Sequence, residues 1–307
     1  MDGPGDEGGG PVVEVTPSRV AQVGALTVRR ALPRRARRTV GAWCFADHMG
    51  PVALTPGLSA DIGPHPHIGL QTVTWLLAGE LLHHDSLGSE QLIRPGQLNL
   101  MTAGHGVVHA EESTATGPHD LHGVQLWVAQ PERTRHGAPA FGHHAELPQA
   151  DLGSALATVL TGELAGARSP ARQDTDGVGA DLVLQPGPGA GPATVPLQPG
   201  FEHALVVTEG AVAIAGGTVV EPGQLAYLGA GRDEIVLSAA GSAPARTLLL
   251  GGVPFEAPIS MWWNFVARDH AEIDAARQAW EAQDPRFGPV ATSLDRIPAP
   301  PVPWATP

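Results

Sequence analysis

Two histidines flank a proline in the segment GPHPHIGLQTVTWLLAG, which covers residues 63–79. Along a β-strand, residues two positions apart project from the same face, so His65 and His67 direct their imidazoles to one side. Pro66 disfavours the α conformation for His65, and the fixed φ of Pro64 also keeps the backbone extended. The pair therefore aims two imidazoles at one point.

A second pair with the same spacing follows in the segment MTAGHGVVHAEES. His109 and Glu111 are two residues apart and come after a turn that contains Gly104 and Gly106. On neighbouring strands, the two pairs would place three nitrogens and one carboxylate oxygen around one divalent metal ion. This donor set suits iron, manganese, nickel, copper, cobalt or zinc, and the lack of a thiolate disfavours a structural zinc site. Four protein ligands leave positions open on a six-coordinate metal, so we expect catalysis or ligand exchange there.

The elements that must position these residues are short apolar segments that end in turn residues. TVTWLLAG, GVQLWVAQ, HALVVTEG and QLAYLGAG are examples, and each has the length of one strand. Strands that recur at this spacing predict an all-β sandwich or barrel. Helical periodicity is clear only near the end of the chain. There Asp269 and Glu272 resemble a capping box, and Ile273, Ala276 and Trp280 share one face.

The same layout of strands and turns occurs twice in the sequence. In each half an apolar strand, a glycine turn and a second strand precede a Pro-Gly turn, which is Pro95-Gly96 in the first half and Pro222-Gly223 in the second. We therefore predict two β-barrels, the second a diverged copy of the first. The predicted boundaries are 1–10 for a disordered N-terminus, 11–145 for an N-terminal metal-binding barrel, 146–290 for a C-terminal barrel and 291–307 for a Pro-rich extended tail.

The net charge of −13 disfavours general binding to nucleic acid or to anionic membranes. The sequence has no run of 18 apolar residues and no N-terminal signal pattern, so we expect a cytoplasmic protein. Cys44 is the single cysteine, which excludes an internal disulfide, and we expect it to be buried. Six arginines gather in residues 29–38. We interpret this cluster as a solvated, mobile connection, with an anion or partner site as the alternative.

The two histidine pairs lie in long motifs that strongly resemble those of the pirin family of bicupins. These motifs are HPHIGLQTVTWLLAG, HHDSLGSEQLIRPGQLNLMTAGHGVVHAEE and HGVQLWV, and the likeness extends upstream to VGAWCFADHMGP and downstream to ISMWWNFVARDHAEI. The resemblance covers most of residues 12–290. It implies a bicupin, with two tandem double-stranded β-helix (jelly-roll) barrels and a short C-terminal helix. It also implies a single metal, usually iron, bound in the first barrel by His65, His67, His109 and Glu111.

Three features depart from the patterns of this superfamily. The general cupin motif has glutamate where this chain has Gln71, a position that does not bind the metal in pirins. Many relatives carry arginine where this chain has His105, so we expect an altered anion or substrate preference at the mouth of the site. In the second half, FEHALVV has no pair of histidines and QLAYLGAG has none at all. We expect the second barrel to bind no metal.

Other polar residues are weaker candidates for roles near the metal. Gln125 alternates with apolar neighbours on its strand, so it would either hydrogen-bond a bound oxygen near the metal or have a structural partner. Asp47 and His48 would either orient a ligand imidazole or stabilise a turn. His83 and His84 are adjacent, so strand geometry does not let them chelate one ion together, and we expect both at the surface.

The resemblance to bacterial pirins implies an iron(II) dioxygenase similar to quercetin 2,3-dioxygenase, which opens a flavonol ring and releases carbon monoxide. Its substrates would be dioxygen and a small aromatic or enolic molecule, and Glu111 would also accept a proton. The alternative is a non-enzymatic, iron-binding regulator whose oxidation state alters its binding to a protein partner. A third alternative is a metal-dependent isomerase or another cupin activity. We expect a monomer, because a bicupin already pairs its own two barrels.

Overall fold

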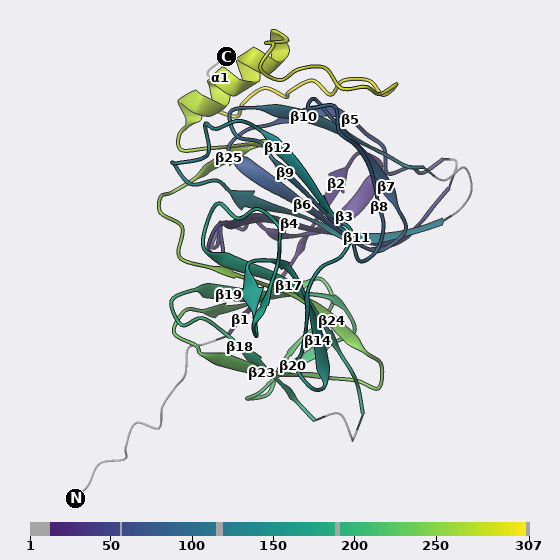
Figure 1. Cartoon of the computed structure of the whole chain (residues 1–307), viewed down its shortest axis with the longest axis vertical. Helices are drawn as coiled ribbons and strands as arrows, with labels where there is room; N and C mark the ends of the chain where they lie inside the picture. Colours follow the sequence, from purple (N-terminus) through teal and green to yellow (C-terminus); the bar gives the residue numbers. More distant parts are fainter. Residues whose placement is uncertain (1–12, 56, 115–118, 188–190, 305–307) are drawn as a thin grey trace, which may run out of the picture.

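The first barrel consists of two facing antiparallel sheets. The computed structural model describes residues 13–55, 57–114, 119–187 and 191–304, so the predicted disordered segment 1–10 lies outside the described residues (Figure 1). The larger sheet has seven strands in the order β12 (Ala140–His144), β9 (Leu98–Thr102), β6 (Leu70–Ala78), β11 (His119–Ala129), β4 (Trp43–Leu54), β3 (Leu26–Leu32) and β2 (Arg19–Val23). The smaller sheet has four, in the order β5 (Ile62–His67), β10 (Val107–Glu112), β7 (Leu81–Asp85) and β8 (Glu90–Ile93).

The second barrel repeats this arrangement, as the repeated pattern in the sequence predicts. Its larger sheet has the order β1 (Glu14–Pro17), β22 (Gln224–Gly229), β19 (Glu202–Glu209), β24 (Ala245–Gly252), β17 (Gly177–Leu184), β14 (Ala155–Thr161) and β13 (Gln149–Asp151). Its smaller sheet has the order β18 (Ala193–Pro196), β23 (Glu234–Ala239), β20 (Val212–Ile214) and β21 (Thr218–Val220). A two-stranded ribbon, β15 (Glu163–Leu164) and β16 (Ala167–Arg168), lies on a connection. The all-β prediction of two tandem barrels is confirmed.

The chain then returns to the first barrel through a hairpin and a helix. The hairpin is β25 (Ser260–Trp262) and β26 (Phe265–Ala267), and the helix is α1 (His270–Glu281). The Asp269 side chain accepts a hydrogen bond from the backbone N–H of Glu272 at 2.9 Å, which confirms the predicted N-terminal cap. The predicted apolar face of α1 is also confirmed, because its buried residues are Ile273, Ala276 and Trp280.

The two barrels lie one above the other in Figure 1, and α1 covers the end of the first barrel that is remote from the second. Apolar residues from both large sheets pack between the barrels in one cluster, which includes Val73, Leu126, Ala204 and Leu250. The central strands of the large sheet of the first barrel, such as β6 and β11, therefore present one face to the second barrel and the other to their own interior. Because both faces are covered, β6 is buried along almost all of its length.

Two segments cross the predicted domain boundaries. Residues 14–17 of β1, expected in the N-terminal barrel, instead pair with β22 of the second. Residues 253–290, expected in the C-terminal barrel, pack against the first, where Phe265 and Val266 join clusters with Val108 and Leu70. The sequence does not reveal these crossings, because an apolar strand has the same composition in either barrel. The C-terminal return segment (residues 253–304) is therefore part of the first barrel.

The predicted C-terminal tail has no helix or strand in residues 291–304, in agreement with an extended segment. It is nevertheless docked, because Ala299 and Val302 are buried against α1. The indole N–H of Trp280 donates to the Ile297 carbonyl at 2.9 Å, and the Ile297 N–H donates to the Pro64 carbonyl of β5 at 2.9 Å. The tail thus supports the strand that carries the first histidine pair.

The arginine cluster is only partly the mobile connection that the sequence predicts. Arg29 and Arg30 lie in β3, where Arg29 donates to the Gly50 carbonyl at 2.8 Å. Arg37 pairs with Glu14 at 2.8 Å and stacks over the Tyr227 ring. These contacts fix half of the cluster to strands of both barrels. Within the described part of the chain, no helix has the length and apolar character needed to cross a membrane.

We predict that Asp181 is essential for joining the two barrels. Its buried carboxylate accepts hydrogen bonds from Arg246 at 2.5–3.0 Å and from the Trp75 indole of the first barrel at 3.0 Å. Asp181→Ala would leave a partly buried guanidinium and a buried N–H without their acceptor, and should lower the free energy of unfolding by about 3 kcal/mol. Urea denaturation measures this. The exposed Asp233→Ala should change stability by less than about 0.5 kcal/mol, and equal stabilities for the two variants would contradict the assignment.

Candidate metal centre

The two predicted histidine pairs lie on adjacent strands. β10 pairs with β5 in antiparallel fashion, and the register places His109 directly opposite His65 and Val107 opposite His67. The extended conformation predicted for the H-P-H segment is confirmed, because β5 runs from Ile62 to His67. His65 and His67 therefore share a face, and His109 reaches the same face from the neighbouring strand.

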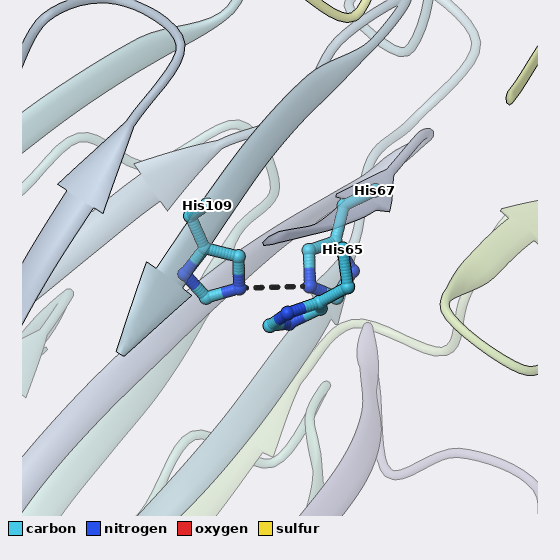
Figure 2. Close-up of side chains that lie close together, drawn as sticks. All are labelled: His65, His67 and His109. Atoms are coloured by element: carbon cyan, nitrogen blue, oxygen red, sulfur yellow. Dashed lines mark hydrogen bonds between the residues drawn. The ribbon is translucent and has the colours of Figure 1, made fainter. Parts of the chain in front are cut away.

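The three imidazoles converge on one point inside the barrel (Figure 2). One nitrogen from each ring lies within 4.8 Å of the other two, and Nε2 of His67 is 3.1 Å from Nε2 of His109. All three side chains are buried, with exposed fractions of 7%, 1% and 2% for His65, His67 and His109. Among the described residues, this is the one group of three or more potential ligands at such spacing.

Backbone carbonyls fix the protonation of two of these rings. Nδ1 of His65 faces the Gly63 carbonyl at 2.9 Å, and Nδ1 of His67 faces the Asn264 carbonyl at 3.0 Å. A carbonyl oxygen only accepts hydrogen bonds, so each Nδ1 carries the proton and donates it. In the neutral ring the remaining nitrogen, Nε2, then holds a lone pair that is available to a metal. The β25–β26 turn, which contains Asn264, thus orients the imidazole of His67 on β5.

The barrel interior keeps these rings neutral. Burial lowers the pKa of His65 to about 4, and a hydrogen bond to Gly63 only partly offsets this effect. Burial, reinforced by the neighbouring imidazoles, lowers the pKa values of His67 and His109 well below their usual range. Neutral imidazole is the form that binds metal, so the site is prepared for a cation at neutral pH.

Glu111 lines the same cavity but stands slightly apart from the three rings. A β-bulge pairs Glu111 with Ile62 and leaves an extra residue on β5, so its carboxylate is not in the group within 4.8 Å. No hydrogen-bond donor or cation among the described residues contacts this carboxylate, and burial raises its pKa to about 7. This carboxyl group is buried beside neutral imidazoles and has no positively charged partner among the described residues. Such a set of donors fits a metal site, because a bound cation would supply the missing positive charge.

A cavity of about 500 Å³ opens onto these four residues. Its walls include the aromatic side chains of Phe45, Trp127, Trp262 and Trp263. Trp263 has a φ of 53°, a left-handed conformation that is strained for a residue other than glycine, and such strain concentrates at functional sites. The volume and the aromatic walls suit one small planar molecule.

Two of the weaker candidates, Gln125 and Asp47, also line this cavity. Gln125 accepts a hydrogen bond from the Thr74 hydroxyl at 2.9 Å, so it has a structural partner and still borders the cavity. Asp47 forms a bidentate ion pair with Arg30 at 2.6 and 2.7 Å. Neither side chain contacts one of the three imidazoles through a hydrogen bond.

His48 and His105 lie outside the cavity. His48 follows Asp47 on β4 and therefore points to the opposite face, where its Nε2 lies 2.7 Å from Nε2 of His122. His105 is exposed, and its Nδ1–H donates to the Gly137 carbonyl at 2.9 Å in a neighbouring loop. The structure therefore does not bring these two residues to the imidazole cluster.

The prediction that His83 and His84 lie at the surface is wrong. Both are buried, because β7 pairs with β10 and lies inside the small sheet of the first barrel. Nδ1 of His83 lies 3.4 Å from Nδ1 of His109, and Nε2 of His83 lies 3.1 Å from the Asp85 carboxylate. One feature of the sequence could have indicated that His83 and Asp85 act together. They are two residues apart, the same spacing as in the pairs His65–His67 and His109–Glu111.

Comparison with known proteins agrees with this geometry. The pirin family model matches residues 25–128, and the model of the pirin C-terminal cupin domain matches residues 180–288. A protein of Pseudomonas aeruginosa, PA1205, named as a candidate quercetin 2,3-dioxygenase, is 48% identical over 94% of this chain and 90% of its own length. The chain belongs to the pirin family. A pirin-like protein of Caulobacter vibrioides is 38% identical to this pirin over 86% of the chain and 91% of its own length.

A solved structure extends the likeness to three dimensions. The quercetin 2,3-dioxygenase from Acinetobacter baumannii superposes with a TM-score of 0.89 at 40% identity, and the match covers 96% of this pirin and 97% of that chain. The fold of this pirin is thus that of a two-barrel cupin.

We predict that Glu111 destabilises the metal-free protein at alkaline pH. Because burial raises its pKa in the folded chain from 4.5 to about 7, ionisation opposes folding as the pH rises from 4.5 to 7, and the full penalty of about 3 kcal/mol applies above pH 7. Glutamine does not ionise, so Glu111→Gln should be more stable than the wild type by about 3 kcal/mol at pH 8. At pH 5 the difference in stability should be less than about 1 kcal/mol.

Urea denaturation with a chelator present, at pH 5 and at pH 8, measures this difference. The matched control is Glu90→Gln, an exposed glutamate in β8 that should show no such pH dependence. Equal stability of Glu111→Gln and the wild type at pH 8 would show that the negative charge of Glu111 is not buried without a positively charged partner.

Proposed function

We propose that this pirin is a metal-dependent dioxygenase that cleaves a flavonol such as quercetin, or a related enediol. The proposed metal ligands are His65, His67, His109 and Glu111. Two facts about relatives support the reaction class: PA1205 and the Acinetobacter baumannii enzyme are named for quercetin 2,3-dioxygenase activity, and both align with nearly the whole chain.

The observation that carries this proposal is the combination of three neutral imidazoles and an uncompensated carboxylate on one cavity. Nitrogens from all three rings lie within 4.8 Å of one another, and Nε2 of both His65 and His67 is unprotonated. Glu111 adds the negative charge that would offset part of the charge of a divalent cation. A purely structural role would leave Nε2 of His65 and the Glu111 carboxylate without the hydrogen-bond partners that buried polar groups normally have.

We infer that the metal is iron(II), with manganese, nickel, copper, cobalt and zinc compatible with the same ligands. When bound, the metal would supply a Lewis acid for an enolic hydroxyl and a redox-active centre for dioxygen. The donor set contains no thiolate, and Cys44 is buried with its thiol pKa raised to about 12. Cys44 is therefore neither a ligand nor a nucleophile in this reaction.

The cavity walls would bind and orient the substrate. A flat aromatic ring system would pack against these aromatic walls, and burial of its faces would exclude water from the reacting bond. Gln125 lies on the wall of the same cavity, where its amide would position an oxygen of the substrate. These contacts hold the substrate in one orientation, which converts binding energy into reactivity.

Glu111 would serve as the proton acceptor. Burial raises its pKa in the metal-free chain, and once detached from the metal this carboxylate would be a stronger base than an exposed glutamate. A carboxylate oxygen of Glu111 would take the proton of the enolic hydroxyl and leave the substrate as an enolate. The same carboxyl group would return the proton to the ring-opened product.

Oxygen consumption tests the proposal. Protein loaded anaerobically with iron(II) should consume dioxygen when quercetin is added, and His109→Ala should lower the rate at least 100-fold because it removes a proposed ligand. The matched control is His136→Ala, an exposed histidine remote from the cavity lining, which should retain the wild-type rate.

Absence of uptake by protein that demonstrably binds iron would refute the flavonol assignment. It would favour the alternative, an iron-binding regulator whose oxidation state alters its binding to a protein partner. A partner that is captured by the iron(II) form and released by the iron(III) form would then identify that role.

A further inference from the structure

Hydrogen-bond contacts link three side chains, from Asp85 at the end of β7 through His83 to His109 in the imidazole cluster. The β7–β10 register places Asp85 opposite His109 and His83 opposite Glu111. The Asp85 carboxylate lies 3.1 Å from Nε2 of His83, and Nδ1 of His83 lies 3.4 Å from Nδ1 of His109. The His83 ring stacks on Phe141 with a centroid distance of 4.5 Å, which fixes its plane. All three polar side chains are buried.

Two arrangements of protons are compatible with these distances. In the first, His83 donates Nε2–H to Asp85, His109 donates Nδ1–H to His83, and Nε2 of His109 keeps a lone pair toward the cluster. In the second, His109 donates Nε2–H to Nε2 of His67 at 3.1 Å, and its Nδ1 accepts a hydrogen bond from Nδ1–H of His83. The second arrangement turns a lone pair of His83 toward a carboxylate, and it removes His109 as a ligand.

Asp85 selects the first arrangement. A hydrogen bond to an ionised carboxylate is roughly twice as strong as one between two neutral groups. Burial raises the pKa of Asp85, but hydrogen bonds from His83 and Ser89 outweigh this effect, so its pKa lies below the usual value and the group is ionised. The charge on Asp85 therefore outweighs the competing contact between His109 and His67.

The turn after β7 fixes the orientation of the Asp85 carboxylate. Its Oδ1 accepts backbone hydrogen bonds from Leu87 at 2.9 Å and from Ser89 at 3.0 Å. The other oxygen, Oδ2, faces His83. The turn thus fixes the position of Oδ1. The atom at the position of Oδ2 then determines whether His83 carries its proton on Nε2 or on Nδ1.

We propose that Asp85 and His83 are positioning residues that hold His109 in the tautomer whose Nε2 can bind the metal. This inference rests on the proposed metal centre. His65 and His67 are oriented by backbone carbonyls, which no side-chain substitution can reverse. His109 is the one proposed histidine ligand whose tautomer depends on side chains, and partners of this kind tune metal affinity strongly.

Asp85→Asn tests the proposal with a nearly isosteric change. The Leu87 and Ser89 N–H groups require an oxygen, so the new amide must place its NH₂ group toward Nε2 of His83. His83 would then carry its proton on Nδ1 and donate a hydrogen bond to Nδ1 of His109. His109 would in turn become protonated on Nε2, the nitrogen that should bind the metal.

Nitrogen-15 spectra of the metal-free protein report the tautomer directly, and the His109 signals are assigned by their loss in His109→Gln. We expect Nδ1–H in the wild type and Nε2–H in Asp85→Asn. Anaerobic competition for Fe²⁺ against a chelator should show at least tenfold weaker binding by the variant. The matched control is Glu209→Gln, because Glu209 forms a second carboxylate–histidine–histidine chain with His122 and His48 outside the cavity. It should change neither readout at His109.

His83→Phe provides a second test if Asp85→Asn does not fold. Phenylalanine keeps the stack on Phe141 and removes both nitrogens, so His109 should again turn its proton toward His67 and bind Fe²⁺ more weakly. A wild-type tautomer or wild-type affinity in a folded variant would overturn the proposal. Flavonol cleavage enters neither readout, so an enzyme inactive toward flavonols would leave this inference intact. A wild-type protein that binds no Fe²⁺ would overturn both the metal centre and this inference.

Discussion

Burial of three imidazoles and a carboxylate without a protein cation is the constraint around which this fold is built. Each group loses hydration inside the first barrel. Burial therefore lowers the pKa of each histidine and raises the pKa of Glu111, which favours the neutral form of every group. Nitrogens of His67 and His109 face each other at 3.1 Å, a distance at which two lone pairs repel. A divalent cation would relieve both penalties, so the residues of the barrel interior fit a bound metal ion.

The remaining structure holds those groups in place. The second barrel covers the outer face of the large sheet through a shared apolar cluster. The C-terminal return segment supplies the Asn264 carbonyl to His67 and the Ile297 N–H to Pro64 of β5. Parts of the chain about 200 or more residues apart thus orient the strand that carries His65 and His67. Backbone carbonyls orient these two neutral imidazoles, and the side chain of His83 contacts the third, His109.

The sequence was sufficient for the fold class and for the three clustered histidines. A spacing of two in a strand is a strong local rule, and it placed His65 with His67 and His109 with Glu111, each pair on one face of its strand. The rule was less accurate for Glu111, because a β-bulge, which depends on strand pairing, shifts it along β5. His83 and Asp85 escaped prediction because their role depends on the pairing of β7 with β10. The crossing of β1 and β26 to the other barrel escaped prediction for the same reason, since both are ordinary strands whose partners lie far away in the sequence.

The central claim is that His65, His67, His109 and Glu111 together bind one metal ion. An anomalous-difference map from a crystal of iron-loaded protein, recorded above the iron absorption edge, tests it most directly. The account predicts a single strong peak per chain, bonded to Nε2 of the three histidines and to the carboxylate of Glu111. The absence of a peak at the three histidines in fully loaded protein, or a peak at another site only, would contradict it.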